Sequence, residues 1–291
     1  MEIDFLAIGH ATHDRTPDGF RRGGTVCYAA VTAQRLGRSP GILTRASSDG
    51  LLVHETPGRP ENAAAPRGSE LEGISIRLLP SSVNTTFVNI YHDGKRTQVL
   101  ESLAEPISVS DLPAAWSAVP VVLLGPIAGE LGPDWVDQFP NSIMGITPQG
   151  WMRKWDERGH VSSAPWVGAE RCLHRADVVV LSREDVGGDE RVIADLAAQA
   201  RTLLVTDGWR PVELHVAGAR HRLPTRQTRE VDPTGAGDVF AAGYLVGLAE
   251  TGDPLAAARF AIATASMSIE GLGMAAIPDR ARVDEWLIRQ G

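Results

Sequence analysis

Continuous apolar segments of strand length are the feature that most constrains the fold of this chain. Four of them are "VPVVLLG" at residues 119–125, "NSIMGIT" at 141–147, "ADVVVLS" at 176–182 and "RTLLVTDG" at 201–208. A continuous apolar run, unlike an alternating one, is typical of a parallel strand that is covered on both faces. Helical patterns such as "DERVIADLAAQA" lie between some of these runs. The alternation predicts a doubly wound α/β fold with a mostly parallel central sheet.

The N-terminal part of the chain adds to this pattern and then departs from it. Residues 3–9 and 41–47 are expected to be strands, and residues 23–37 contain a helix that can end at Gly37. The stretch "TTFVNIYHDGKRTQVL" has two β-rich runs around an Asp-Gly pair, which predicts a hairpin outside the main sheet. Without an internal repeat or a clear linker, we expect one domain over residues 1–291, with a small β appendage.

Bulk composition excludes several function classes. The net charge of -8 over 291 residues argues against a general nucleic-acid binder. Cys27 and Cys172 are the only cysteines, which fits a reducing compartment better than a disulfide scaffold. The apolar runs fall well short of the roughly 20 residues that cross a bilayer, and "MEID" does not resemble a signal peptide. We therefore expect a cytoplasmic protein that binds neither nucleic acid nor membrane.

The stretch "VDPTGAGDVFAAGYLVGLAE" at residues 231–250 is the best candidate for a chemical site. Residues 239–249 are too apolar for a surface helix, and the small residues before them let backbone N–H groups approach a ligand. A helix N-terminus with free N–H groups attracts anions, and its dipole favours the ionised form of Asp238. Phosphoryl transfer would use both features, because the carboxylate can accept a proton from an attacking hydroxyl. A tight turn followed by an ordinary acidic residue is the structural alternative.

The same stretch resembles a known family signature. "DPTGAGDVFAAG" resembles the C-terminal motif Asp-Thr-x-Gly-Ala-Gly-Asp of the ribokinase-like (PfkB) carbohydrate kinases, with Pro233 in place of Thr. Other matches occur in the family's order along most of the chain: "GG" at residues 23–24, "RLG" at 35–37, "VTDG" at 205–208 and "ARFAIATASMSIEGLG" near the C-terminus. The Gly-Ala-Gly-Asp element is the most specific of these matches.

The resemblance implies a fold and an activity. The family fold is a three-layer α/β/α sandwich with a small β lid, which here would be built from about residues 11–24 and 76–102. The implied activity is an ATP-dependent phosphotransferase with an alcohol group as acceptor, acting on a small sugar or cyclitol with ATP and Mg²⁺. A monovalent cation such as K⁺ is a further candidate cofactor. Some relatives pair through their lids, so a homodimer is an alternative to a monomer.

The resemblance also implies roles for particular residues. Asp238 would be the catalytic base, and Gly235, Ala236 and Gly237 would form the anion hole. On the substrate side the candidates are Asp14, Gly23, Gly24, His13, Tyr28 and Arg153. On the nucleotide side they are Ser182, Thr206, Gly208 and Ala263. Arginine is a good candidate for gripping an oxyanion here, because the chain has only two lysines.

Two departures from the family pattern bear on the function. Tyr28 stands where the family often has a sugar-contacting Asn, and an aromatic ring cannot supply the same amide contacts. Ser182-Arg183-Glu184-Asp185 stands where the family has Asn-x-x-Glu. Asp185 keeps a carboxylate that could hold magnesium through water. These departures, together with "GHATHD" and "PQGWMRKW", resemble the inositol-kinase-like branch, so an inositol-like polyol is weakly favoured. A nucleoside kinase and a catalytically silent sugar-binding protein remain alternatives.

Overall fold

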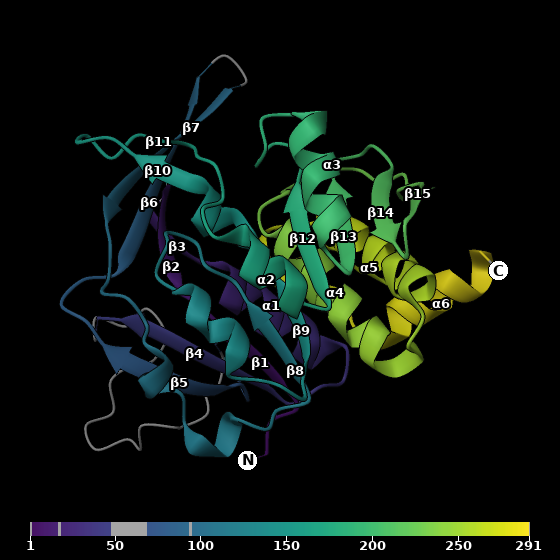
Figure 1. The fold of residues 1–291 in the computed structure, drawn as a ribbon, viewed down its shortest axis with the longest axis horizontal. Coiled ribbons are helices and arrows are strands. Elements are labelled where there is room, and N and C mark those ends of the chain that lie inside the picture. The colour runs from purple at the N-terminus through teal and green to yellow at the C-terminus, as the bar shows by residue number, and fades with distance from the viewer. Residues whose placement is uncertain (1, 17–18, 48–68, 93–94, 291) are drawn as a thin grey trace.

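The apolar runs become neighbouring strands of one central sheet in a computed structural model, which describes residues 2–16, 19–47, 69–92 and 95–290. The described residues place nine strands in the order β15-β14-β13-β12-β9-β8-β1-β4-β5 (Figure 1). Their bounds are β1 (Phe5–Ile8), β4 (Pro40–Ala46), β5 (Ser75–Pro80), β8 (Val121–Leu124), β9 (Ile143–Ile146), β12 (Val178–Ser182), β13 (Thr202–Thr206), β14 (Val212–Val216) and β15 (Ala219–Leu223). Pairing is parallel from β5 to β13 and antiparallel at β13–β14 and β14–β15. The predicted, mostly parallel sheet is confirmed.

Two buried apolar clusters cover the two faces of this sheet. The helices are α1 (Thr25–Arg35), α2 (Ala169–Arg175), α3 (Glu190–Gln199), α4 (Ala236–Thr251), α5 (Pro254–Ser268) and α6 (Arg280–Gln290). In β1, Phe5 and Ala7 belong to the cluster that includes α1, α4 and α5, whereas Leu6 and Ile8 belong to the cluster that includes α2 and α3. Successive strand side chains point to opposite faces, so a strand that is apolar throughout stabilises both layers at once.

Helix α4 lies in the interior, as its apolar sequence predicts. It is buried from Val239 to Gly247, between the sheet and α5. The two helices pack closely because α4 presents glycines: a Cβ built at Gly247 would lie 3.1 Å from the Cα of Ala257. Pro254 begins α5, and the side chain of Asp253 caps that helix by accepting from the Leu255 N–H at 2.8 Å. The burial of α4 matters for function because its N-terminus carries Asp238.

The β lid is a separate four-stranded sheet with the order β3-β2-β6-β7. Its strands are β2 (Thr12–Thr16), β3 (Gly19–Gly23), β6 (Thr85–His92) and β7 (Lys95–Ser102). The predicted hairpin is present as the antiparallel pair β6–β7, although its Asp93-Gly94 tip lies outside the described residues. The predicted lid start at residue 76 is wrong, because β5 pairs in parallel with β4 at the edge of the central sheet. A short hairpin, β10 (Arg153–Trp155) with β11 (Val161–Ser163), packs beside β7.

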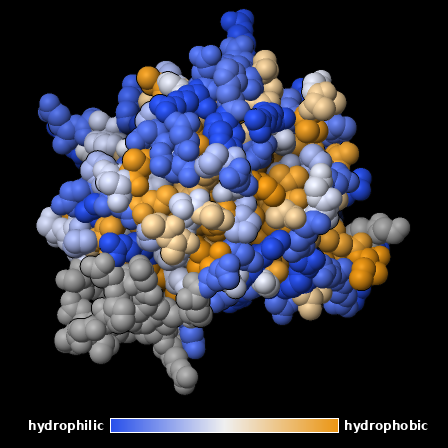
Figure 2. Space-filling view, turned by 60° about the horizontal axis from the view of Figure 1, so that its bottom comes forward, coloured by the Kyte–Doolittle hydropathy of each residue, from blue (hydrophilic) through white to orange (hydrophobic). Residues whose placement is uncertain are grey.

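The surface is mixed in polarity. In Figure 2, hydrophobic residues form a broken band across the middle of the visible face, with hydrophilic residues around it. Within the described part of the chain, no helix has the length and apolar character needed to span a bilayer.

Candidate active site

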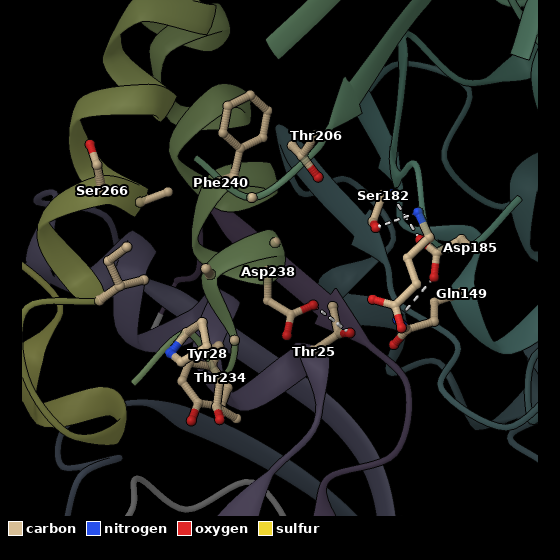
Figure 3. Close-up of a pocket in the computed structure, with 18 of the residues that line it drawn as sticks. Thr25, Tyr28, Gln149, Ser182, Asp185, Thr206, Thr234, Asp238, Phe240 and Ser266 are labelled. Carbon is tan, nitrogen blue, oxygen red and sulfur yellow. Dashed lines mark hydrogen bonds between the residues drawn. The ribbon is translucent and has the colours of Figure 1, made fainter. Parts of the chain in front are cut away.

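A cleft of about 780 Å³ opens where the carboxyl ends of the parallel strands meet the N-terminus of α4 and the lid. This edge is where open α/β sheets bind ligands, because the loops leave room there and helix N-termini point at it. Figure 3 shows Asp238 near the centre of the cleft, with Thr25 beside it and Asp185 across from it. Predicted site residues that line the cleft are Asp14, Gly24, Tyr28, Arg153, Ser182, Asp185, Thr206, Gly208, Gly235, Ala236, Gly237 and Asp238.

The N-terminus of α4 presents backbone donors to the cleft. Among the described residues, the N–H groups of Gly235, Gly237 and Asp238 meet no acceptor, while the Ala236 N–H donates to the Pro233 carbonyl at 3.1 Å. Of the three residues expected to form an anion hole, Gly235 and Gly237 thus present N–H groups to the cleft, whereas the Ala236 N–H is used within the turn. The first turn of any helix leaves such N–H groups without a partner in the helix. Here they lie in a cleft, where an anion can accept from them.

Gly235 is required by its surroundings. It caps α4 with φ +76°, a left-handed conformation that favours glycine. A Cβ added there would lie 2.2 Å from Cδ1 of Tyr28, so the ring packs directly against the glycine backbone. Tyr28 is only 5% exposed. Its ring therefore supports the turn that precedes α4 and offers little open surface for stacking on a substrate.

Asp238 is held as a base close to neutral pH. Its Oδ1 accepts a hydrogen bond from the Thr25 hydroxyl at 2.7 Å. Burial raises the pKa of Asp238 to about 6, the Thr25 hydrogen bond and Arg153 oppose that rise, and Asp185 and Asp14 add to it. The helix dipole was expected to favour the ionised form, but burial has the larger effect. A pKa near 6 suits a general base, which must be ionised at neutral pH and still able to take a proton.

The lid contributes alternate residues of β2. Thr12 and Asp14 line the cleft, whereas His13 does not, and its ring centroid lies 5.1 Å from that of Phe20. The expectation that His13 contacts substrate is not supported, because neighbouring strand residues point to opposite faces. Gly23 does not line the cleft either, and a Cβ there would lie 2.4 Å from Oδ2 of Asp14. Gly23 thus leaves room for the Asp14 carboxylate rather than for substrate.

Asp185 is oriented by two hydrogen bonds. Its Oδ2 accepts from the Ser182 N–H at 2.8 Å, and its Oδ1 accepts from Nε2 of Gln149 at 3.1 Å. Gln149 was not predicted as a site residue, although it belongs to the "PQGWMRKW" segment. No group of three metal-ligating side chains occurs within the described residues. A single oriented carboxylate fits Mg²⁺, which keeps several waters and takes phosphate oxygens as further ligands.

Arg153 brings a positive charge to the same cleft. Its Nη1 donates to the Ile127 carbonyl at 3.5 Å, and its guanidinium lies 5.8 Å from the ring centroid of Phe87. Both contacts come from neighbouring segments that also line the cleft. The guanidinium is therefore held by the wall of the cleft, in position to interact with an anion there.

The end of the cleft beyond Thr206 has several apolar side chains beside the hydroxyl of Ser266. The apolar residues are Phe240 of α4, Val212 of β14, Ile262 and Ala265 of α5, and Ile269 directly after α5. The predicted Ala263 is fully buried in the core and does not line the cleft, because 100° of helix rotation separates it from Ile262. Trp209, at the rim, is 80% exposed. This end has the character of a slot for a flat, largely apolar group.

Comparisons with known proteins agree with the geometry. A profile of the pfkB family of carbohydrate kinases matches residues 172–280, which include the Ser182 and Asp238 segments. Escherichia coli fructokinase is 28% identical over 279 residues, covering 87% of this chain and 86% of that protein. A solved pyrophosphate-dependent kinase of the ribokinase family, complexed with a pyrophosphate analog and myo-inositol, has a TM-score of 0.76 at 22% identity, over 97% of this chain and 99% of that one. Arabidopsis thaliana ribokinase complexed with ribose and ATP has a TM-score of 0.72 at 18% identity, over 99% of each chain.

Both solved structures have the same three-layer fold and lid as this protein, as the sequence resemblance implied. The sequence profile covers the segment that carries the Gly-Ala-Gly-Asp turn and the strands beside it. From these matches, residues 172–280 of this chain belong to the pfkB family of carbohydrate kinases, and the whole chain has the ribokinase-like fold.

Proposed function

We propose that this protein transfers the terminal phosphoryl group of ATP to a hydroxyl group of a small sugar or cyclitol. One observation carries the proposal. The Asp238 carboxylate and the unpartnered N–H groups of Gly235 and Gly237 share the first turn of α4 and open onto the same cleft as Asp14 of the lid. A base and a set of anion donors side by side are what phosphoryl transfer to an alcohol requires.

The reaction would proceed in one step at Asp238. The acceptor lies between Asp14 and Asp238, with Asp14 accepting hydrogen bonds from its other hydroxyl groups. As the attacking oxygen bonds to phosphorus and the bond to the ADP oxygen breaks, the hydroxyl proton passes to the Asp238 carboxylate. The N–H groups of Gly235 and Gly237 stabilise the charge on the moving phosphoryl group. Because the pKa of Asp238 is about 6, most of the protein holds the base ionised above pH 7.

Asp185 is the residue that would hold Mg²⁺, through water, near the phosphates. Its two hydrogen bonds, from the Ser182 N–H and Gln149, fix the carboxylate plane at the edge of the cleft. The metal would neutralise charge on the phosphate oxygens, as it does in phosphoryl transfer generally. Arg153, which also lines the cleft, would add a second positive charge.

The apolar end of the cleft favours ATP over pyrophosphate as the donor. Pyrophosphate would fill only the phosphate-binding part of the cleft, whereas the adenine ring of ATP would also occupy the space lined by Phe240, Ile262 and Ile269. The polar lining at the lid end, from Thr12, Asp14 and Gln98, favours an acceptor with several hydroxyl groups. The myo-inositol complex of the pyrophosphate-dependent neighbour supports a cyclitol as one acceptor to test. The low exposure of Tyr28 argues against a nucleobase at this position.

The test is ADP or phosphate release from a panel of cyclitols, pentoses, hexoses, sugar acids and nucleosides, with ATP or pyrophosphate as donor. We expect ATP with a sugar or cyclitol to give turnover, and Asp238→Asn to lower kcat on the order of 10²–10⁴-fold while calorimetric binding of the acceptor is kept. Asp137→Asn, an exposed aspartate on the opposite layer, is the matched control and should behave as wild type. Wild-type turnover by Asp238→Asn would refute the mechanism. Binding without turnover across the whole panel would instead support a silent sugar-binding protein.

A further inference from the structure

The hydrogen bond from Thr25 to Asp238 joins two residues that are 213 positions apart in the chain. We propose that Thr25 is a positioning residue for the catalytic base: its hydroxyl group fixes the Asp238 carboxylate in the orientation in which the other oxygen faces the acceptor. This inference rests on the proposed function, since it assigns Thr25 a task only if Asp238 takes the acceptor's proton.

Thr25 stands at a rigid point of the backbone. It is the first residue of α1 and is only 2% exposed. The preceding Gly24 has φ +88°, and a Cβ there would lie 2.4 Å from the carbonyl oxygen of His10, which follows β1. The start of α1 is thus packed closely against the segment that joins β1 to β2. The hydroxyl of Thr25 therefore reaches Asp238 from a fixed backbone position.

The side chain is also held by packing. A Cβ built at Gly125, which follows β8, would lie 2.4 Å from Cγ2 of Thr25 and 2.8 Å from its Cβ. Glycine at position 125 therefore makes the space that the Thr25 methyl group fills. A β-branched side chain has few χ1 choices, so a methyl group seated on Gly125 aims the hydroxyl at Asp238. Thr25 donates to Oδ1 at 2.7 Å, and no described residue is recorded as donating to Oδ2.

The hydrogen bond has an electrostatic consequence as well as a geometric one. A hydroxyl that donates to a carboxylate favours its ionised form, so Thr25 keeps the pKa of Asp238 below the value that burial alone would give. Burial keeps the neighbouring titratable groups of α1 neutral across an ordinary assay range, because it raises the pKa of both Cys27 and Tyr28. The charged groups that act on Asp238 from other elements are Arg153 of β10, Asp185 after β12 and Asp14 of β2.

The test compares three variants in the same kinase assay between pH 5 and pH 9. Thr25→Val keeps the shape and removes the hydroxyl. We expect the acidic limb of kcat/KM to move up by about one pH unit and the plateau of kcat to fall roughly ten-fold. Thr25→Ser keeps the hydroxyl, so the acidic limb should return to its wild-type position. Thr32→Val is the matched control, because Thr32 is also buried on α1 but donates to the Tyr28 carbonyl at 2.7 Å.

Two results would overturn the proposal. One is a wild-type pH profile and plateau for Thr25→Val. The other is an equal loss in Thr25→Val and Thr25→Ser without movement of the acidic limb, which would mean that only packing matters. If thermal melting shows Thr25→Val to be unfolded, Thr25→Ala and Thr25→Ser give the same comparison of a side chain without and with the hydroxyl. Asp238→Asn distinguishes failure of the proposed function from failure of the role given to Thr25. If Asp238→Asn keeps turnover, the proposed function is refuted. If Asp238→Asn is inactive while Thr25→Val behaves as wild type, only the role of Thr25 is refuted.

Discussion

Replacing Asp238 by its neutral isostere should stabilise the folded protein while removing turnover. Burial raises the pKa of Asp238 from its ordinary value of 3.8 to about 6. At neutral pH the Asp238 carboxylate is ionised in a buried site that disfavours its charge in the folded protein. In the unfolded chain the same carboxylate is ionised in water, so its charge lowers the free energy of unfolding. Asparagine has nearly the same shape, carries no charge and can accept the same hydrogen bond from Thr25.

The size of the effect follows from the pKa difference. A rise of about two units corresponds to about 3 kcal/mol when the group is fully ionised in both states, since one unit is about 1.4 kcal/mol. Water in the open cleft screens part of this cost, so we expect a gain of about 1–2 kcal/mol at pH 8. The sign follows from proton linkage, because the folded protein binds the Asp238 proton more tightly than the unfolded chain does. The resulting stabilisation is fully present below about pH 4 and is lost as the pH rises through about 6. The advantage of Asp238→Asn should therefore shrink as the pH falls.

Urea unfolding of both proteins at pH 5 and pH 8 measures this difference directly. Asp185→Asn is the contrasting control. The Asp185 carboxylate accepts hydrogen bonds from the Ser182 N–H and Gln149, so its replacement should lower the free energy of unfolding at both pH values. The reasoning is refuted if Asp238→Asn is no more stable than wild type at pH 8, or if its advantage is the same at both pH values.

Two further predictions concern the ends of the cleft. Gly235→Ala should lower the free energy of unfolding by about 1–3 kcal/mol and impair turnover, because it forces φ +76° on alanine against the Tyr28 ring. Gly252→Ala is the control, because Gly252 has φ +64° at the other end of α4 and an added Cβ there would meet no atom within 4 Å. This variant should be less stable in urea titrations but keep its kcat. Equal kinetics in the two variants would contradict a role for Gly235. ATP, but not pyrophosphate, should change the fluorescence of the exposed Trp209, and Trp209→Leu should raise KM for ATP several-fold while Trp209→Phe does not. An unchanged KM in Trp209→Leu would remove this residue from the nucleotide end.

The central sheet could be predicted because its signal is local. Each parallel strand is apolar along its whole length, so residues 119–125 or 176–182 identify themselves without reference to a partner. The edge strand β5 gave no such signal, since its residues Ser75–Pro80 are only partly buried. That pattern also suits a lid strand, and only the pairing of β5 with β4 decides between the two.

The same distinction applies to the site. The turn at 235–238 is contiguous, so its glycines and its acid can be found in the sequence. Thr25 and Thr12 reach the cleft through contacts between distant segments, and no sequence pattern marked them. Gln149 lies in the segment "PQGWMRKW", which resembles the inositol-kinase-like branch, but its contact with Asp185 appears only in the fold. The predictions for His13 and Ala263 each chose a residue next to one that lines the cleft. His13 follows Thr12 and precedes Asp14 on a strand, and Ala263 follows Ile262 on a helix, so both side chains point away from the cleft.

The position of a charge at the mouth of an apolar helix follows from how α4 is stabilised. A helix that is apolar all round must be buried, and α4 is enclosed by the sheet, α1 and α5. That burial carries the first turn of α4, with its free N–H groups, into a region where electrostatic interactions are strong. The same burial raises the pKa of Asp238, and the hydroxyl of Thr25 limits the rise. The contact between α1 and α4 thus affects both the packing of the core and the pKa of Asp238. A substitution that loosens α1 against α4 should therefore lower the free energy of unfolding and shift the pH profile of activity together.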